Sequence, residues 1–321
     1  MKRYGELTST VETERNKFVF ADEAGRYLRP NSTSMKSLSF ICALAIVSTA
    51  RLLALNEIPD EYRTGPFALG CQAYTFHRFT FFEAVEKTAA AGGRVIELFP
   101  GQKLSPESDA KVDHNASEEV IAQIKAKLEK HKIRAVNYGV VGLPNNEQES
   151  RKVFEFAKKL GLYAVTSEPA ADAMDLIEKL VKEYDIGMAI HNHPKQPKNP
   201  NYKFWDPDYI LSLVQNRDKR LGSCADLGHF ARSGIKPADA LKKLEGRVIS
   251  SHLKDIKPFG PNGADVPFGT GESDVVAALK ELQRQNFKGN ISVEYESNLQ
   301  NNVGDVGQCI GFVRGFVAAA K

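Results

Sequence analysis

The sequence predicts an α/β protein with one domain, a closed (β/α)8 barrel. From residue 67 onward, short apolar runs alternate with segments whose apolar residues recur at helical spacing, and this pattern repeats eight times. Alternation of this kind gives parallel strands joined by helices, and eight repeats are enough to close the sheet. The chain has 321 residues and is 42% hydrophobic, so it can supply a barrel of roughly 250 residues and an N-terminal extension.

Each expected strand is a short apolar run, and each expected helix shows the helical apolar period. The strands are expected at Phe67–Tyr74, Arg94–Phe99, Ile133–Tyr138, Leu162–Thr166, Ile186–His191, Arg220–Asp226, Arg247–Leu253 and Asn290–Tyr295. The helices are expected at Phe82–Ala91, Ser117–His131, Glu147–Leu160, Ala171–Tyr184, Pro207–Gln215, Pro237–Leu244, Asp274–Gln285 and Asp305–Ala319.

An open, doubly wound sheet is the competing fold. That fold usually carries a glycine-rich turn after its first strand. Here the turn reads Tyr74-Thr75-Phe76-His77-Arg78, and no phosphate-cradling GxGxxG or GxxxxGK[ST] motif stands in an appropriate place. The pattern therefore favours the closed barrel.

The N-terminal region reads as an extension followed by a secretory signal. Residues 1–34 are polar and lack an apolar period, so they are not expected in a packed core. Residues 35–50 combine a basic start, an apolar run of about ten residues and a Ser-Thr-Ala end, which is typical of a signal peptide and too short for a comfortable membrane span. Residues 51–66 would then be a linker, and 67–321 the barrel.

This interpretation predicts export to the periplasm or the exterior of a bacterial cell, with no stable membrane span after processing. If residues 35–50 instead form a buried or interfacial helix, the protein is expected in the cytoplasm. The formal net charge of +3 is small, so nucleic acid is not an expected partner. Four cysteines without a CxxC pair indicate neither a disulfide framework nor a structural zinc knot.

Metal-ligating residue types stand where the expected strands end. Asp226, His229 and His252 follow two neighbouring strands, and the C-terminal ends of all strands of such a barrel meet at one mouth. Glu168 and Glu294 stand at two further strand ends. Carboxylates and imidazoles suit a borderline divalent ion such as Mn, Mg, Co or Zn. Taken singly, each of these residues could equally be a cap, an ion-pair partner or an ordinary buried histidine.

Other side chains near the mouth are candidates for substrate binding. Alternation sends His191 and His193 to the same side of the expected strand, and a polar turn ended by Pro194 is the competing interpretation. His229 and Lys254 could bind substrate or support the metal ligands. Trp205, in a long loop at 195–206, could offer a flat face to a sugar ring, and Glu97 is a weaker candidate.

From residue 67 to the end, the chain resembles the xylose-isomerase-like TIM barrels, which include sugar isomerases, epimerases and apurinic endonucleases. The resemblance rests on Ser-Glu-Pro at Glu168, Asp-x-x-His at 226–229, His-Leu-Lys-Asp at 252–255, the turn at 269–272 and Val-Glu-Tyr-Glu at 293–296. It implies that Glu168, Asp226, His252 and Glu294 bind one divalent ion and that the two glutamates also move protons. The choice of Glu294 over Glu296 rests on the resemblance alone.

The resemblance implies an isomerase or epimerase that takes a proton from the carbon next to a carbonyl of a small sugar or polyol, through a metal-stabilised enediolate. A lyase or hydratase that acts on a keto-sugar or 3-keto-glycoside by β-elimination would need the same groups. A sugar-binding barrel without turnover, and an apurinic endonuclease-like phosphodiesterase, are less favoured alternatives. A homo-oligomer is compatible with the sequence.

Overall fold

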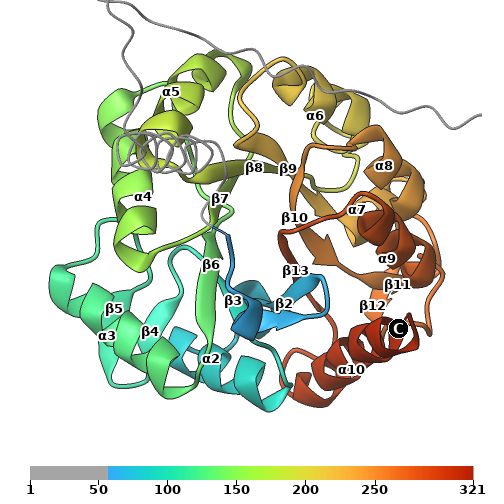
Figure 1. Cartoon of the computed structure of the whole chain (residues 1–321), viewed down its shortest axis with the longest axis horizontal. Coiled ribbons are helices and arrows are strands. Elements are labelled where there is room, and N and C mark those ends of the chain that lie inside the picture. The colour runs from blue at the N-terminus through green and yellow to red at the C-terminus, as the bar shows by residue number, and fades with distance from the viewer. Residues whose placement is uncertain (1–56, 321) are drawn as a thin grey trace, which may run out of the picture. The chain divides into compact units, whose positions relative to one another are not determined.

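A closed barrel of parallel strands forms the centre of the protein in the computed structural model, which describes residues 57–320 (Figure 1). Its parallel strands are β2 (Phe67–Gln72), β3 (Val95–Leu98), β6 (Arg134–Tyr138), β7 (Ala164–Ser167), β8 (Gly187–His191), β9 (Leu221–Asp226), β10 (Val248–Leu253) and β13 (Asn290–Val293). They pair in sequence order, and pairing of β13 and β3 with β2 closes the ring. The short strand β1 (Arg63–Thr64) adds to β2 in antiparallel orientation. The predicted (β/α)8 fold is therefore confirmed.

Helices surround the barrel, as the ring of coiled ribbons in Figure 1 shows. They are α2 (Phe81–Ala90), α3 (Glu118–Lys130), α4 (Glu147–Leu160), α5 (Met174–Tyr184), α6 (Pro207–Val214), α7 (Leu227–Arg232), α8 (Pro237–Lys243), α9 (Val275–Arg284) and α10 (Val303–Ala319). Short 3-10 helices are η2 (Asp60–Tyr62), η3 (Ala73–Phe76) and η4 (Ala171–Ala173). The helix α7, which begins directly after β9, was not expected from the sequence.

Two short hairpins extend the connections at the barrel. One joins β4 (Lys103–Ser105) to β5 (Ser108–Lys111), and the other joins β11 (Asp255–Lys257) to β12 (Ala264–Val266). The second hairpin follows β10 closely and brings Asp265 near α7, where Arg232 binds it. Neither hairpin was among the strands expected from the sequence.

Local sequence signals explain where the helices begin and end. Thr80 and Glu83 form a reciprocal capping box at the start of α2, which satisfies backbone donors that the helix itself cannot. Asn146 caps α4, and Gly161 ends this helix in the left-handed conformation that favours glycine. Asp226 caps α7 by accepting from the backbone N–H of His229, so one side chain ends β9 and starts the helix.

The barrel interior changes from apolar at its N-terminal end to polar at its C-terminal end. Apolar residues fill the first part, among them Ala68, Val95, Ala164, Ala189 and Cys224, with Ile58 packed against them. Because side chains alternate along a strand, the residue two positions after Ala189 or Cys224 faces the same interior. Those residues are His191 and Asp226, at the ends of their strands.

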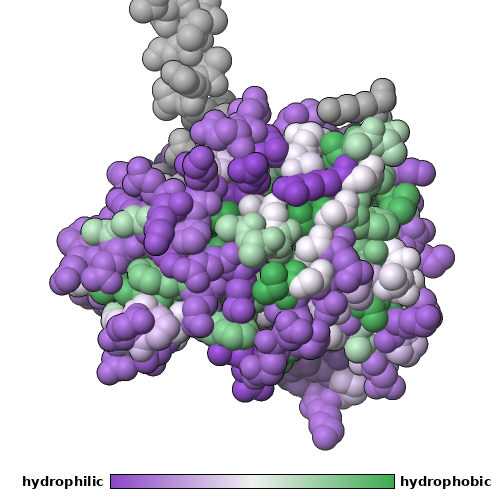
Figure 2. Space-filling view, turned by 90° about the horizontal axis from the view of Figure 1, so that it is seen from below, coloured by the Kyte–Doolittle hydropathy of each residue, from purple (hydrophilic) through white to green (hydrophobic). Residues whose placement is uncertain are grey.

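The larger core lies between sheet and helices and holds most of the buried aliphatic and aromatic residues. On the face shown in Figure 2, hydrophilic residues surround small apolar areas, as expected for helices that turn their apolar sides to the sheet. Among the described residues, no helix combines the length and the apolar character needed to cross a bilayer.

The expected extension at 1–34 and signal peptide at 35–50 lie outside the described residues. The expected linker at 51–66 is described from residue 57 onward, and this part contributes η2, β1 and the buried Ile58 to the barrel. The barrel unit therefore starts before residue 67.

Candidate metal centre and substrate pocket

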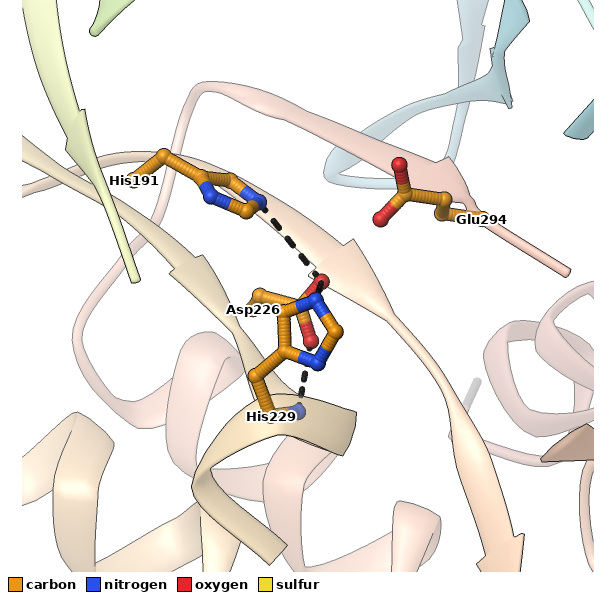
Figure 3. Close-up of side chains that lie close together, drawn as sticks. All are labelled: His191, Asp226, His229 and Glu294. Atoms are coloured by element: carbon orange, nitrogen blue, oxygen red, sulfur yellow. Dashed lines mark hydrogen bonds and ion pairs between the residues drawn. The ribbon is translucent and has the colours of Figure 1, made fainter. Parts of the chain in front are cut away.

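Four buried side chains from consecutive strand ends converge at the C-terminal mouth of the barrel. His191 ends β8, Asp226 ends β9, His252 lies near the end of β10, and Glu294 directly follows β13. His191 Nε2 lies 3.2 Å from His252 Nδ1 and 3.7 Å from Asp226 Oδ2. His252 Nδ1 lies 3.2 Å from Glu294 Oε2 and 3.7 Å from Asp226 Oδ2. Figure 3 shows the Asp226 carboxylate between the rings of His191 and His229, with the carboxylate of Glu294 across from them.

The spacing and chemistry of these atoms fit one divalent cation. Ligand atoms about 2.1 Å from an ion and at right angles to each other lie about 3.0 Å apart. Within the described part of the chain, the buried Asp226 Oδ2 and Glu294 Oε2 accept no well-aligned hydrogen bond, and the Lys254 ammonium is their nearest positive charge. Burial lowers the pKa of His191, which keeps its imidazole neutral as a ligand must be. Burial alone would lower the pKa of His252, but Cys224, Glu97 and Glu294 raise it well above its ordinary value, so a bound cation would displace a proton from this imidazole. With that proton released, two carboxylates and two imidazoles suit manganese, cobalt or zinc.

His229 borders the same carboxylates. One ligand atom from each of His191, Asp226, His229 and Glu294 can be chosen so that all lie within 4.8 Å of one another. His229 Nε2 lies 3.6 Å from Asp226 Oδ2, and Arg232 Nη1 lies 3.3 Å from His229 Nδ1.

Glu97 lies beneath this centre and orients His252. Glu97 Oε2 lies 3.1 Å from His252 Nε2, while Glu97 Oε1 accepts hydrogen bonds from Asn290 and Ser292 at 2.7 and 2.6 Å. A carboxylate behind a histidine fixes its tautomer and leaves its other nitrogen for an ion. Glu97 is fully buried and is not among the residues that line the substrate pocket, where the sequence predicted it.

Lys254 supplies the positive charge inside the centre. Its ammonium lies 2.6 Å from Glu296 Oε1, 2.8 Å from Glu294 Oε2 and 3.2 Å from Asp226 Oδ2. Burial alone would raise the pKa of Glu294, but Lys254 and His252 hold this pKa below its ordinary value. Burial alone would lower the pKa of Lys254, whereas the three carboxylates raise it. Lys254 thus stays charged and lies below the pocket wall as a supporting group.

Glu168 does not join the four converging side chains, although the sequence predicted it as a ligand. Its Oε1 accepts hydrogen bonds from His193 Nδ1 at 2.5 Å and from Tyr202 at 2.7 Å, and it lies 4.0 Å from His191 Nδ1. Burial alone would raise the pKa of Glu168, but these hydrogen bonds keep it below its ordinary value. Strand β8 ends at His191 within the converging group, whereas Glu168 directly follows β7 and lies beside His193 and Tyr202.

A pocket of about 320 Å³ opens beside this centre. Its polar side includes His191, His193, His229, Glu294 and Glu296. Tyr74, Phe99, Gln72, Gly139 and Val140 complete the lining. Tyr74 stacks on His77 and meets Phe99 edge to face at 4.9 Å between ring centroids. One polar and one aromatic side suit a sugar, which presents both hydroxyls and apolar C–H faces.

Of the substrate residues predicted from sequence, His191, His193 and His229 line the pocket, whereas Trp205 does not. Lys195 covers the Trp205 ring at 4.6 Å. Sequence reasoning missed Tyr202 as the partner of Glu168, Tyr74 and Phe99 as the aromatic side, and Arg232 as the partner of His229. Tyr74 and Phe99 could have been found, because each is the last residue of an expected strand.

Comparisons with known proteins agree with this fold. The family model described as xylose isomerase-like TIM barrel matches residues 85–314. A solved structure of an uncharacterized protein from Parabacteroides distasonis is 30% identical, covers 78% of the chain and 99% of that protein, and has a TM-score of 0.63.

Two more distant structures share the fold at 17% identity. One is a D-tagatose 3-epimerase-like protein, with a TM-score of 0.61 over 78% of this chain and 97% of that one. The other is the IolI protein with a bound zinc atom, with a TM-score of 0.58 over 78% and 98%. A comparison with curated protein sequences finds no match.

Proposed function

Because the chain belongs to the xylose isomerase-like TIM barrel family, we propose that it is a divalent-metal-dependent isomerase or epimerase of a small sugar. The observation that carries this proposal is the convergence of His191, Asp226, His252 and Glu294 beside a sugar-sized pocket. Epimerase-like and zinc-binding proteins among the structural neighbours support it at the level of the fold.

In this proposal His191, Asp226, His252 and Glu294 hold the cation, with Glu97 behind His252. A bound divalent ion would polarise a carbonyl oxygen of the sugar and so acidify the adjacent C–H bond. Tyr74 and Phe99 bind the apolar side of the sugar and hold it against the polar wall. The pocket residues thereby exclude water from the carbon that exchanges its proton.

Glu294 is one proton carrier, because it lines the pocket and its carboxylate is charged. His193 is the second carrier in this proposal. Glu168 binds its Nδ1, which leaves Nε2 for a proton of the substrate. Glu168 then acts through His193 rather than directly, which modifies the role that the family resemblance implies for it.

Proton exchange in heavy water tests this function. Candidate ketoses are incubated with Mn²⁺ and the full-length protein, and deuterium is measured at the carbon next to the carbonyl. We expect exchange in the wild type and a loss of at least about 100-fold in Glu294→Gln, since acid–base help contributes roughly 10²–10⁴-fold. Glu245→Gln, which alters a surface carboxylate paired with Arg284, serves as the matched control and should exchange like the wild type. Absence of exchange with every ketose and aldose tested would contradict the proposal.

A β-eliminating lyase is the second candidate, and a neighbouring cavity favours it. This cavity, of about 730 Å³, is lined by Glu168, His193 and residues 194–198, and it shares His193 with the inner pocket. A leaving group attached to a keto-sugar could extend from the inner pocket into this space. Product analysis separates the two functions: epimers or aldose–ketose pairs indicate the first, and release of an aglycone or water indicates the second.

A further inference from the structure

Arg232 contacts His229 and is not among the residues that line the inner pocket. Arg232 Nη1 lies 3.3 Å from His229 Nδ1 with hydrogen-bond geometry. The guanidinium also donates to Asp265 Oδ1 at 2.6 Å and to the carbonyl of Gly263 at 3.0 Å. Both partners lie on or next to β12, so the hairpin after β10 holds the guanidinium of Arg232, the last residue of α7. Asp265 is itself held, because its Oδ2 accepts from the backbone N–H of Glu296 at 2.8 Å.

This contact decides which nitrogen of His229 carries the proton. A guanidinium has only donors, so His229 Nδ1 must accept from Arg232. A neutral imidazole has one acceptor and one donor nitrogen, and the proton therefore sits on Nε2. A nitrogen that carries a proton has no lone pair for a metal ion.

The N–H group at His229 Nε2 is available to a ligand in the inner pocket. His229 lines the inner pocket, and its Nε2 lies 3.6 Å from Asp226 Oδ2, beyond normal hydrogen-bond distance. The ring is held on a second side by His193, which stacks on it with centroids 5.2 Å apart. The N–H is thus fixed in direction while its acceptor is left to a ligand.

We propose that Arg232 is a positioning residue that keeps His229 as the Nε2–H tautomer, so that His229 donates a hydrogen bond to a sugar oxygen and is not a metal ligand. The role of this hydrogen bond in turnover rests on the function proposed above. There, a fixed donor stabilises the negative charge that develops on the carbonyl oxygen when the neighbouring proton leaves. The same tautomer explains why His252, whose Nδ1 faces Asp226 and Glu294, completes the ligand set instead of His229.

Nitrogen NMR tests the tautomer without any assay of activity. Full-length protein labelled with ¹⁵N-histidine is compared with His229→Gln to assign the ring signals of residue 229. We expect the wild type to show the proton on Nε2, and Arg232→Leu to show a mixture of both tautomers. A proton on Nδ1 in the wild type, a doubly protonated ring, or an unchanged tautomer in Arg232→Leu would overturn the proposal.

Further variants keep this test decisive. If Arg232→Leu does not fold, Arg232→Gln replaces it, because an amide can accept as well as donate and no longer dictates the tautomer. Arg284→Leu is the control for loss of a charged helix residue. It should leave the His229 signals unchanged, since Arg284 lies at the end of α9 and pairs with Glu245 and Glu281.

Kinetics then test the consequence for turnover. Arg232→Leu should lower kcat by about 10–100-fold, as for other residues that orient a functional histidine, with KM changed by less than about threefold. In a His229→Gln background, the same substitution should cost no more than about twofold, because its target is gone. A full additional loss in that background would show that Arg232 acts by another route. If the protein shows no isomerase or epimerase activity on sugars, the NMR experiment still determines which nitrogen of His229 carries the proton.

Discussion

Replacing Glu97 by glutamine should weaken cation binding although Glu97 does not touch the cation site. The Glu97 carboxylate accepts from Asn290 and Ser292 with one oxygen and binds His252 Nε2 with the other. A glutamine that keeps its carbonyl toward Asn290 and Ser292 turns its NH₂ toward His252. His252 Nε2 must then accept, and the imidazole proton moves to Nδ1, the nitrogen that faces Glu294 and Asp226.

The size of this effect follows from the loss of one oriented ligand. Changes of a group that orients a ligating histidine reduce metal affinity by about 10–100-fold, which corresponds to roughly 1.4–2.8 kcal/mol. Isothermal titration of the metal-free protein with Mn²⁺ or Zn²⁺ measures this change directly. The result should be a dissociation constant at least tenfold higher, with the stoichiometry unchanged.

Ser292→Ala is the matched control for this experiment. It removes a hydrogen bond to the same carboxylate but leaves the bond to His252 Nε2 in place. We expect a loss of about 1 kcal/mol in the free energy of unfolding and an affinity within about threefold of the wild type. If Glu97→Gln binds the cation as tightly as the wild type does, then His252 Nδ1 is not a ligand and the reasoning is refuted.

Three further outcomes follow from the structure. Gly228→Ala should reduce deuterium exchange strongly. A Cβ at residue 228 would lie 2.6 Å from Lys254 Cβ and would displace the Lys254 ammonium from Glu294 and Glu296. Exchange at the wild-type rate would contradict this prediction. Thr80→Ala should cost about 1 kcal/mol of stability, since it removes the capping box of α2 far from the centre, and thermal unfolding with unchanged exchange checks it. Saturating Mn²⁺ at about 100 times its dissociation constant should raise stability by about 2.7 kcal/mol in thermal unfolding, and His191→Ala should lose this gain.

The order of strands and helices could be predicted because it depends on local periodicity. The expected helix at 147–160 matches α4 residue for residue, and each expected strand overlaps a strand of the barrel. The helix α7 could not be recognised from the sequence, because no loop separates it from β9. Asp226 is both the last residue of β9 and the N-cap of α7. The hairpin β11–β12 is too short to show alternation, so its contact with Arg232 could not be foreseen.

Which strand-end groups touch each other depends on packing that sequence spacing does not contain. His191 and Glu168 both stand at strand ends, but β7 ends at Ser167 and Glu168 turns to His193 and Tyr202. The full burial of Lys254 was equally out of reach, because lysine is normally exposed and only the three surrounding carboxylates make its burial favourable.

Elemental analysis of the purified protein is the most direct test of the central claim that His191, Asp226, His252 and Glu294 close around one cation. The metal content is measured in the wild type, in His191→Ala and in Glu168→Gln, each confirmed as folded by its thermal transition. We predict one equivalent of a divalent ion in the wild type and in Glu168→Gln, and a loss of the ion in His191→Ala. An ion retained by His191→Ala but lost from Glu168→Gln would contradict this ligand set.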